Sequence, residues 1–396
     1  MTAGEAVSLE QHLAALLAQV HPLDPLDITL NDALGCQLVG AVTATVPLPH
    51  FARCEIGGYA VRRADLTGAA SLKVVDDVAP GFAPTQPVYA GVAVRVAAGT
   101  PLPSGADTVV PGPEVAVGSQ VQLSGQPEVG SGVLAVGSIA AEGATVLPDG
   151  AIIDATAIGL LALLGRLRVS VRPQPRVVVV TIGNELLQVG APMTPGLVHD
   201  SAGPLLCAIG EEHGALAYRV GPIPYEERAI AEAVDDQLIR ADLVVVVGEI
   251  ATGDSLIRGQ LAHLGDVSYD EGSTSLGAFG HGAVGEDQVP LLALPGDPAR
   301  AALLFGVLAV PMIHAMRGVR SPTPIQVRLG SDVDRLPVTR LVPAVLRGDT
   351  ATPVAASGLS LLDLNRADVV LRVLPGTGQQ PMGASVLALP LRTSPT

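Results

Sequence analysis

Two polar turns near the middle of the chain have residue types suited to ligand binding. The apolar run 177–180 leads into Thr181-Ile-Gly-Asn-Glu-Leu186, which has a hydroxyl, an amide and a carboxylate around a glycine. A β-branched run that ends in such a turn predicts a buried strand followed by a loop of the active-site type.

The second turn is Leu294-Pro-Gly-Asp-Pro-Ala-Arg300. Here Gly296 permits a turn, Asp297 is a helix N-cap and Pro298 takes the first helical position, where its missing N–H costs nothing. A helix N-terminus attracts anions through its dipole and free N–H groups. Two interpretations are open: a phosphate or oxyanion site, or simply a well-capped helix.

Both turns belong to a stretch in which strands and helices alternate. The pattern predicts strands at 177–181, 217–220, 243–247 and 291–294, and helices at 204–213, 226–240, 254–264 and 298–317. Crossovers of this length are right-handed, so several strands should be parallel with helices on both faces. This is an open, doubly wound α/β sheet, and the loops after the carboxyl ends of its strands should share one crevice.

The rest of the chain does not show this alternation of strands and helices. Residues 8–20 predict an amphipathic helix capped by Ser8, a short helix begins near Asn31, and another runs from Asp154 to Gly165. Short β-type runs with Gly and Pro punctuation fill the inserted stretch and the end of the chain. We expect four parts: a mixed helical domain (1–46 and 135–173), an inserted β-rich domain (47–134), the α/β domain (174–318) and a small C-terminal β-barrel (319–396).

The amino-acid composition disfavours some classes of function. The 396 residues have a formal net charge of −15, with five Tyr, four Phe and no Trp, which disfavours nucleic acid as a partner. Cys36, Cys54 and Cys207 have neither disulfide-framework nor zinc-type spacing. The N-terminus lacks a signal-peptide pattern, and the apolar run 301–313 is too short to span a bilayer. We expect a cytoplasmic protein with no membrane span.

The eight histidines show no metal-ligand spacing, so exposed or helix-capping roles are expected for most of them. The segment Gly280-His-Gly282 is interpreted as a turn.

Several fragments, taken in order, resemble the molybdopterin molybdenumtransferase family, which includes MoeA and the gephyrin E-domain. They are Gly58-Tyr-Ala-Val-Arg62, the segment from Arg95 to Val110 with Gly99-Thr-Pro-Leu-Pro, the two polar turns described above, and Gly196-Leu-Val-His-Asp-Ser201. The resemblance covers essentially the whole chain. It implies a homodimer whose crevice binds adenylated molybdopterin, inserts molybdate with the help of Mg²⁺, and releases AMP.

The resemblance also assigns residues to roles. Glu185 and Asp254 are the catalytic candidates, and with Glu226 they are the metal candidates. The molybdate or phosphate candidates are Ser273, Ser275 and Arg300. The molybdopterin and nucleotide candidates are Thr181, Gly183, Asn184, Asp200, Ser201, Gly248, Gly253, Gly296 and Asp297.

Some positions depart from the family pattern. Gly57 and Asn184 stand where the family has an acidic residue, Glu249 enters a glycine-rich loop, and Ser275 replaces a lysine. Losing a cation next to carboxylates weakens the binding of a dianion. One alternative is therefore a catalytically inactive, gephyrin-like scaffold that binds a peptide of another protein, with the groove at the C-terminal β-domain. Another is pterin or nucleotide binding without chemistry.

Overall fold

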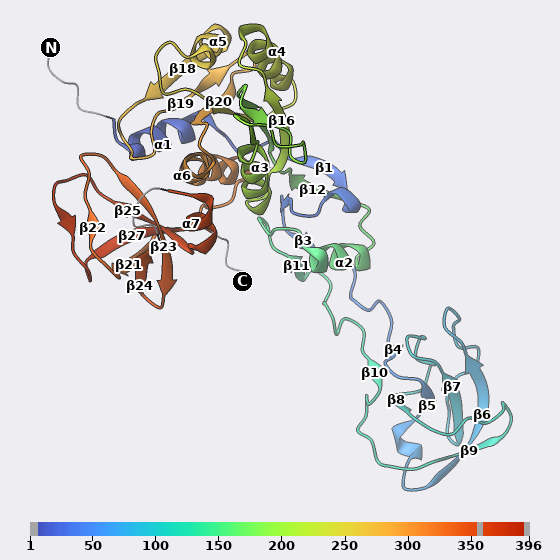
Figure 1. Ribbon diagram of the computed structural model, residues 1–396. Coiled ribbons are helices and arrows are strands. Elements are labelled where there is room, and N and C mark those ends of the chain that lie inside the picture. Colours follow the sequence, from blue (N-terminus) through green and yellow to red (C-terminus); the bar gives the residue numbers. More distant parts are fainter. Residues whose placement is uncertain (1–6, 355–358, 392–396) are drawn as a thin grey trace. The chain divides into compact units, whose positions relative to one another are not determined.

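The computed structural model in Figure 1 describes residues 7–354 and 359–391. The chain forms two compact units. The first contains residues up to Val39, Ile152–Asp154 and the chain from Arg168 onward, and the second contains Gly40–Ala151 and Ala155–Leu167.

The first unit is built on a six-stranded sheet. Its order is β16 (Leu216–Ile223), β13 (Arg176–Ile182), β17 (Leu243–Gly248), β20 (Val289–Pro295), β19 (Phe279–Val284) and β18 (Gly265–Asp270). The first four strands are parallel, and β19 runs antiparallel to both of its neighbours. The predicted parallel strands, and the α/β fold class they define, are confirmed.

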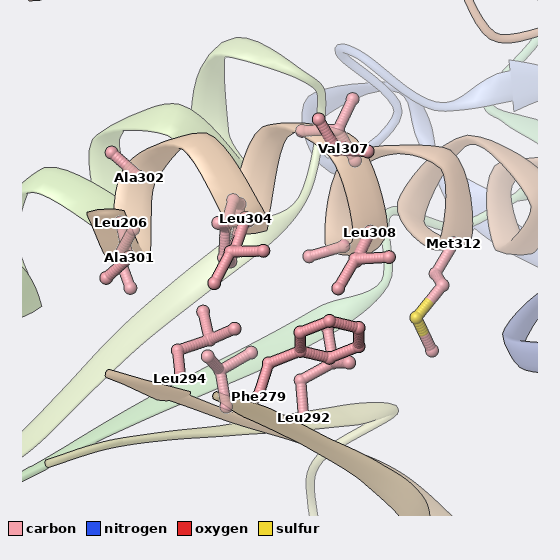
Figure 2. Close-up of a cluster of buried hydrophobic side chains, with 14 of the residues drawn as sticks. Leu206, Phe279, Leu292, Leu294, Ala301, Ala302, Leu304, Val307, Leu308 and Met312 are labelled. Atoms are coloured by element: carbon pink, nitrogen blue, oxygen red, sulfur yellow. The ribbon is translucent and has the colours of Figure 1, made fainter. Parts of the chain in front are cut away.

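Alternate valines of the central strands enter two separate cores, because successive side chains of a strand point to opposite faces. Val177 and Val179 pack with α1 (Leu9–Gln19), α3 (Ala202–Glu212) and α6 (Pro298–Arg317). Val178 and Val180 pack with α4 (Glu227–Leu238) and α5 (Leu256–Leu264). Figure 2 shows part of the first core, in which Leu304 and Leu308 of α6 face Phe279, Leu292 and Leu294 of the sheet.

The predicted helices of this region are present, with small changes at their ends. The N-cap of α1 is Ser8, as expected, and the side chain of Gln11 completes a capping box. The helix predicted over 254–264 begins two residues later, at Leu256, and Ser255 is its N-cap because its Oγ accepts from the N–H of Arg258. Asp254 therefore lies in the preceding loop.

The interpretation of Gly280-His-Gly282 as a turn is wrong, because these residues lie in the middle of β19. The glycines are there for close packing. A Cβ on Gly282 would lie 2.0 Å from the carbonyl oxygen of Asp266 on β18, and one on Gly280 would lie 2.6 Å from the ring of Tyr269. Two glycines so close together are typical of a loop, which is why the sequence predicts a turn. In the structure they allow β18 and β19 to pair closely as antiparallel strands.

The C-terminal part forms a closed five-stranded barrel, as predicted. Its strands, in order, are β21 (Ile325–Leu329), β24 (Thr350–Pro353), β23 (Arg340–Arg347), β25 (Val369–Val373) and β27 (Ser385–Pro390). A small pair, β22 (Val333–Asp334) with β26 (Gln379–Gln380), and α7 (Leu361–Arg366) accompany it. The first unit also has a three-stranded sheet made of β1 (Leu26–Thr29), β12 (Arg168–Arg172) and β2 (Gln37–Leu38), with a 3₁₀ turn at Leu30–Asp32.

The second unit contains a five-stranded sheet with apolar clusters on its two faces. The order is β8 (Thr108–Val110), β5 (Gly58–Val61), β7 (Val92–Val96), β6 (Ala70–Val78) and β9 (Gln120–Leu123). Two short pairs complete it, β3 (Val42–Thr43) with β11 (Thr145–Leu147) and β4 (Arg53–Cys54) with β10 (Val133–Leu134), together with α2 (Ala155–Leu163) and a 3₁₀ turn at Arg63–Asp65.

Among the described residues, α6 alone is long and apolar enough to cross a membrane by length and composition. However, 78% of that stretch is buried inside the structure. Its side chains cover the α/β sheet, as expected for a core helix (Figure 2).

Candidate functional site

A crevice lies at the carboxyl ends of the parallel strands β13, β17 and β20. A cavity of about 100 Å³ opens there, lined by five of the predicted residues: Thr181, Glu185, Asp200, Ser201 and Gly296. Two short strands form one wall, β14 (Leu186–Leu187) and β15 (Val198–His199). Pockets for whole small ligands usually measure several hundred Å³, so this cavity holds only a part of a nucleotide-sized molecule.

Asp200 is the most firmly held polar group of the crevice. Its side chain is completely buried. Oδ2 accepts a hydrogen bond of 2.8 Å from the hydroxyl of Thr181, and Oδ1 accepts one of 3.0 Å from the N–H of Gly203. Because both oxygens have partners inside the protein, Asp200 joins the end of β13 to the start of α3 and shapes the crevice.

Glu185 is exposed and folds back over its own turn. A Cβ on Gly183 would lie 2.6 Å from both carboxylate oxygens of Glu185, so only glycine leaves room for the carboxylate in this position. The N–H of Gly183 donates to the carbonyl of Ile223 at the end of β16. The turn thus leaves the Glu185 carboxylate exposed at the mouth of the crevice.

Asn184 ties the loops after three strands together. Its Oδ1 accepts from the N–H of Tyr225 at 2.9 Å, and the Tyr225 hydroxyl accepts from the N–H of Leu256 at 3.0 Å. The first bond connects the loop after β13 to the loop after β16, and the second continues to the start of α5. Asn184 therefore acts as an acceptor within the protein, a role that an aspartate also fills.

The loop after β17 is held mainly by its own contacts. A Cβ on Gly248 would lie 2.6 Å from Cδ1 of Ile257, so this glycine is needed for packing whether or not a ligand approaches. The carboxylate of Glu249 accepts from the N–H of Ala251 at 2.8 Å, inside the loop. Around Gly253 there is open space, and the neighbouring Asp254 is exposed.

The three predicted metal ligands, Glu185, Glu226 and Asp254, are all exposed. In the described part of the chain, no three His, Cys, Asp or Glu side chains are grouped so that they could hold a metal ion. The structure therefore does not gather these carboxylates into a site that fits Mg²⁺.

The start of α6 has its own anionic cap. The Asp297 side chain accepts from the N–H of Arg300 at 2.9 Å, and Pro298 has no N–H to offer. The carboxylate already occupies the favourable end of the helix dipole, which leaves little attraction for an external anion. These contacts favour the interpretation of a well-capped helix.

The predicted anion residues come from two neighbouring segments. A Cβ on Gly277 would lie 3.8 Å from Nη1 of Arg300, so the guanidinium reaches the loop that contains Ser273 and Ser275. The Ser273 hydroxyl is already committed, because it donates to Oδ2 of Asp270 at 2.7 Å. Arg300 and Ser275 are the members of this group best placed to meet an anion.

Asp270 also links this loop to a pair of buried histidines. Its Oδ1 lies 3.3 Å from Nε2 of His12 on α1, and Nδ1 of His12 lies 2.9 Å from Nε2 of His281 on β19. Burial, together with the nearby His12, lowers the pKa of His281. The expectation that most histidines are exposed or cap helices is wrong for three of the eight, because His12, His281 and His314 are buried within helices and a strand, whereas His213 is buried but is the C-cap of α3.

Two residues that support the elements around the crevice were missed from the sequence. Tyr225 bridges loops through both its N–H and its hydroxyl. Arg219 of β16 packs against α3, where a Cβ on Gly203 would lie 2.7 Å from Cδ of Arg219 and 2.8 Å from Oδ2 of Asp200. The aliphatic part of Arg219 thus packs beside Asp200 at the start of α3. Only its position near the end of a predicted strand could have indicated this.

Both halves of the chain match family models of proteins that are connected with molybdopterin. Residues 7–165 match the MoeA N-terminal region (domain I and II), and residues 178–315 match a probable molybdopterin binding domain. Molybdopterin molybdenumtransferase 1 of Mycobacterium tuberculosis is 31% identical over 339 residues, which cover 80% of this chain and 79% of that protein. Molybdopterin molybdenumtransferase of Staphylococcus epidermidis is 27% identical over 360 residues, which cover 85% and 83%.

The fold is similar to that of a solved structure as well. The molybdopterin biosynthesis MoeA protein of Pyrococcus horikosii superposes with a TM-score of 0.75 at 23% identity, covering 98% of this chain and all of that one. At 23% identity, the similarity to the Pyrococcus structure shows that the multidomain fold is shared. Membership of the family is shown by the Mycobacterium protein, at 31% identity over 80% of this chain. The chain belongs to the molybdopterin molybdenumtransferase family of molybdenum-cofactor biosynthesis.

Proposed function

We propose that this chain is a catalytically active molybdopterin molybdenumtransferase, which inserts molybdate into adenylated molybdopterin and releases AMP. The observation that carries the proposal is the crevice at the ends of β13, β17 and β20. There the buried pair Thr181 and Asp200 shapes the wall, and the carboxylate of Glu185 lies at the mouth.

In this proposal each polar residue has a task that its surroundings support. Glu185 presents a negative charge and two acceptor oxygens to the ligand, because its carboxylate is exposed at the mouth of the crevice. Arg300, with Ser275 on the loop that its guanidinium reaches, offsets the negative charge of molybdate or phosphate. Gly296 and Ser201 line the opening. No part of the proposed reaction is assigned to Mg²⁺, because Glu185, Glu226 and Asp254 are not gathered into a site that fits this ion.

The departures from the family pattern do not disable these contacts. Asn184 supplies the acceptor oxygen that the Tyr225 N–H requires, and the carboxylate of Glu249 is turned into its own loop. Arg300 supplies positive charge next to the loop in which Ser275 supplies none. The scaffold alternative therefore rests on the sequence departures alone. The four-part division, the homodimer and the cytoplasmic location stay predictions.

Complementation tests the proposal. A strain that lacks its molybdenumtransferase should regain molybdoenzyme activity with the wild-type chain but not with Glu185→Gln. The matched control is Glu211→Gln, which removes an exposed carboxylate near the far end of α3. Failure of the well-expressed wild-type chain would favour the scaffold, and equal rescue by both variants would remove Glu185 from the site.

A further inference from the structure

The C-terminal barrel contains a second cavity, of about 190 Å³, far along the chain from the crevice residues. Part of its wall is a row across three strands: Gln326 of β21 is opposite Leu387 of β27, which in turn is opposite Arg372 of β25. Directly paired residues lie on the same face of a sheet. Arg335, Gln380 and Ser385 also line the cavity.

Two buried donors at this cavity lack an acceptor. Nε of Arg335 and Nε of Arg372 are both inaccessible to solvent and have no hydrogen-bond partner among the described residues. Each arginine is held elsewhere through Nη2, Arg335 by the carbonyl of Pro375 at 2.8 Å and Arg372 by the carboxylate of Glu10. Buried polar groups are nearly always satisfied, so two such donors around one hollow indicate that an acceptor belongs there.

The charge around the cavity points to the kind of acceptor. None of the lining residues is acidic. The nearest acidic residues in the sequence are engaged, since Asp334 accepts from Gln379 and Asp332 from the N–H of Met382. Burial lowers the pKa of Arg372, and the one carboxylate that pairs with this arginine, that of Glu10, is not part of the cavity wall.

We propose that this cavity binds a small oxyanion, a phosphate or a carboxylate group, between Arg335 and Arg372. Guanidinium N–H groups match both kinds of oxyanion in geometry and charge. Gln380 and Ser385 add neutral donors to the same wall. The size of the cavity suits an anionic head group with a short substituent rather than a nucleotide. This site is separate from the proposed transferase crevice.

The full-length chain tests the proposal by titration with sodium phosphate and, separately, sodium acetate, at an ionic strength held constant with chloride. Calorimetry and thermal unfolding report binding. The variant is Arg335→Gln, and the matched control is Arg328→Gln, which removes an exposed arginine that pairs with Asp349 on the same barrel. The wild type and the control should bind one of the anions alike, whereas Arg335→Gln should bind it about tenfold more weakly or not at all.

Anion binding near Arg300 does not confuse the result, because both barrel variants leave that region unchanged. If Arg335→Gln lowers the unfolding temperature in chloride alone, Gln380→Ala combined with Ser385→Ala removes donors without removing charge and should also weaken binding. Binding of phosphate only or of acetate only identifies the head group. The proposal is overturned if neither anion binds the wild type more strongly than chloride does, or if Arg335→Gln binds like Arg328→Gln.

Discussion

The hydroxyl of Thr181 donates to Oδ2 of Asp200 over 2.8 Å, and both side chains are buried at the crevice although they are 19 residues apart in the chain. This contact joins the end of β13 to the beginning of α3. The loop between them contains Glu185, so the position of the exposed carboxylate depends on a buried pair beneath it.

Two replacements of Thr181 distinguish what its hydroxyl and what its shape contribute to stability. Thr181→Val leaves Oδ2 of Asp200 buried without this partner, so we expect the free energy of unfolding to fall by about 1–3 kcal/mol. Thr181→Ser keeps the hydroxyl and should lose less. Urea unfolding of both variants checks this, and an equal loss would show that the hydrogen bond contributes little.

Asn184 should tolerate an acidic replacement. Because its Oδ1 only accepts from the N–H of Tyr225, Asn184→Asp preserves the bond and should change stability by no more than about 0.5 kcal/mol. Asn184→Leu cannot accept and should cost about 1 kcal/mol. Hydrogen exchange of the Tyr225 amide gives the local readout. Faster exchange in the leucine variant alone is expected, and unchanged exchange there would exclude the contact in solution.

A methyl group at Gly183 should move the Glu185 side chain out of its present position. Alanine at this position would clash with both carboxylate oxygens of Glu185, so Gly183→Ala should displace that side chain and reduce ligand affinity while the fold is retained. Gly259→Ala is the control, because Gly259 lies inside α5 with open space around it. That variant should instead gain about 0.5–1 kcal/mol of stability. Calorimetry with AMP compares the two, and equal affinities would disprove the clash argument.

The buried pair His213 and His314 predicts a loss of stability in acid. Their ring nitrogens are 3.3 Å apart, and burial lowers the pKa of both, that of His314 from 6.5 to about 4. Between these values the unfolded chain binds more protons than the folded one, so stability is complete above pH 6.5 and falls as the pH drops toward 4. His314→Gln should make the unfolding temperature less dependent on pH in this window. An unchanged slope would mean that other groups cause it.

The architecture of the α/β region could be predicted because its signals are local. Each signal determines structure within a few residues. Examples are the valine runs of β13 and β17, and the N-cap Asp297 and C-cap Gly318 of α6. The barrel was also predictable from short β runs. In contrast, β18 and β19 were missed, because their glycines are explained only by neighbouring strands that are distant in the sequence.

The site was predictable only in part, for a related reason. A motif shows which residues stand near a strand end, and five of the residues it named, Thr181, Glu185, Asp200, Ser201 and Gly296, line one cavity. It does not show what each side chain already binds. The commitment of Ser273 to Asp270, and the bridge made by Tyr225, depend on contacts that no local pattern records.

The central claim is that the crevice around Glu185 and Asp200 performs the family reaction. The most direct test mixes the purified chain with adenylated molybdopterin in a magnesium-containing buffer, adds molybdate, and measures AMP. We predict release of AMP that requires molybdate and is lost in Glu185→Gln. No release of AMP by the folded wild-type chain, at a protein concentration equal to that of the substrate, would contradict the claim.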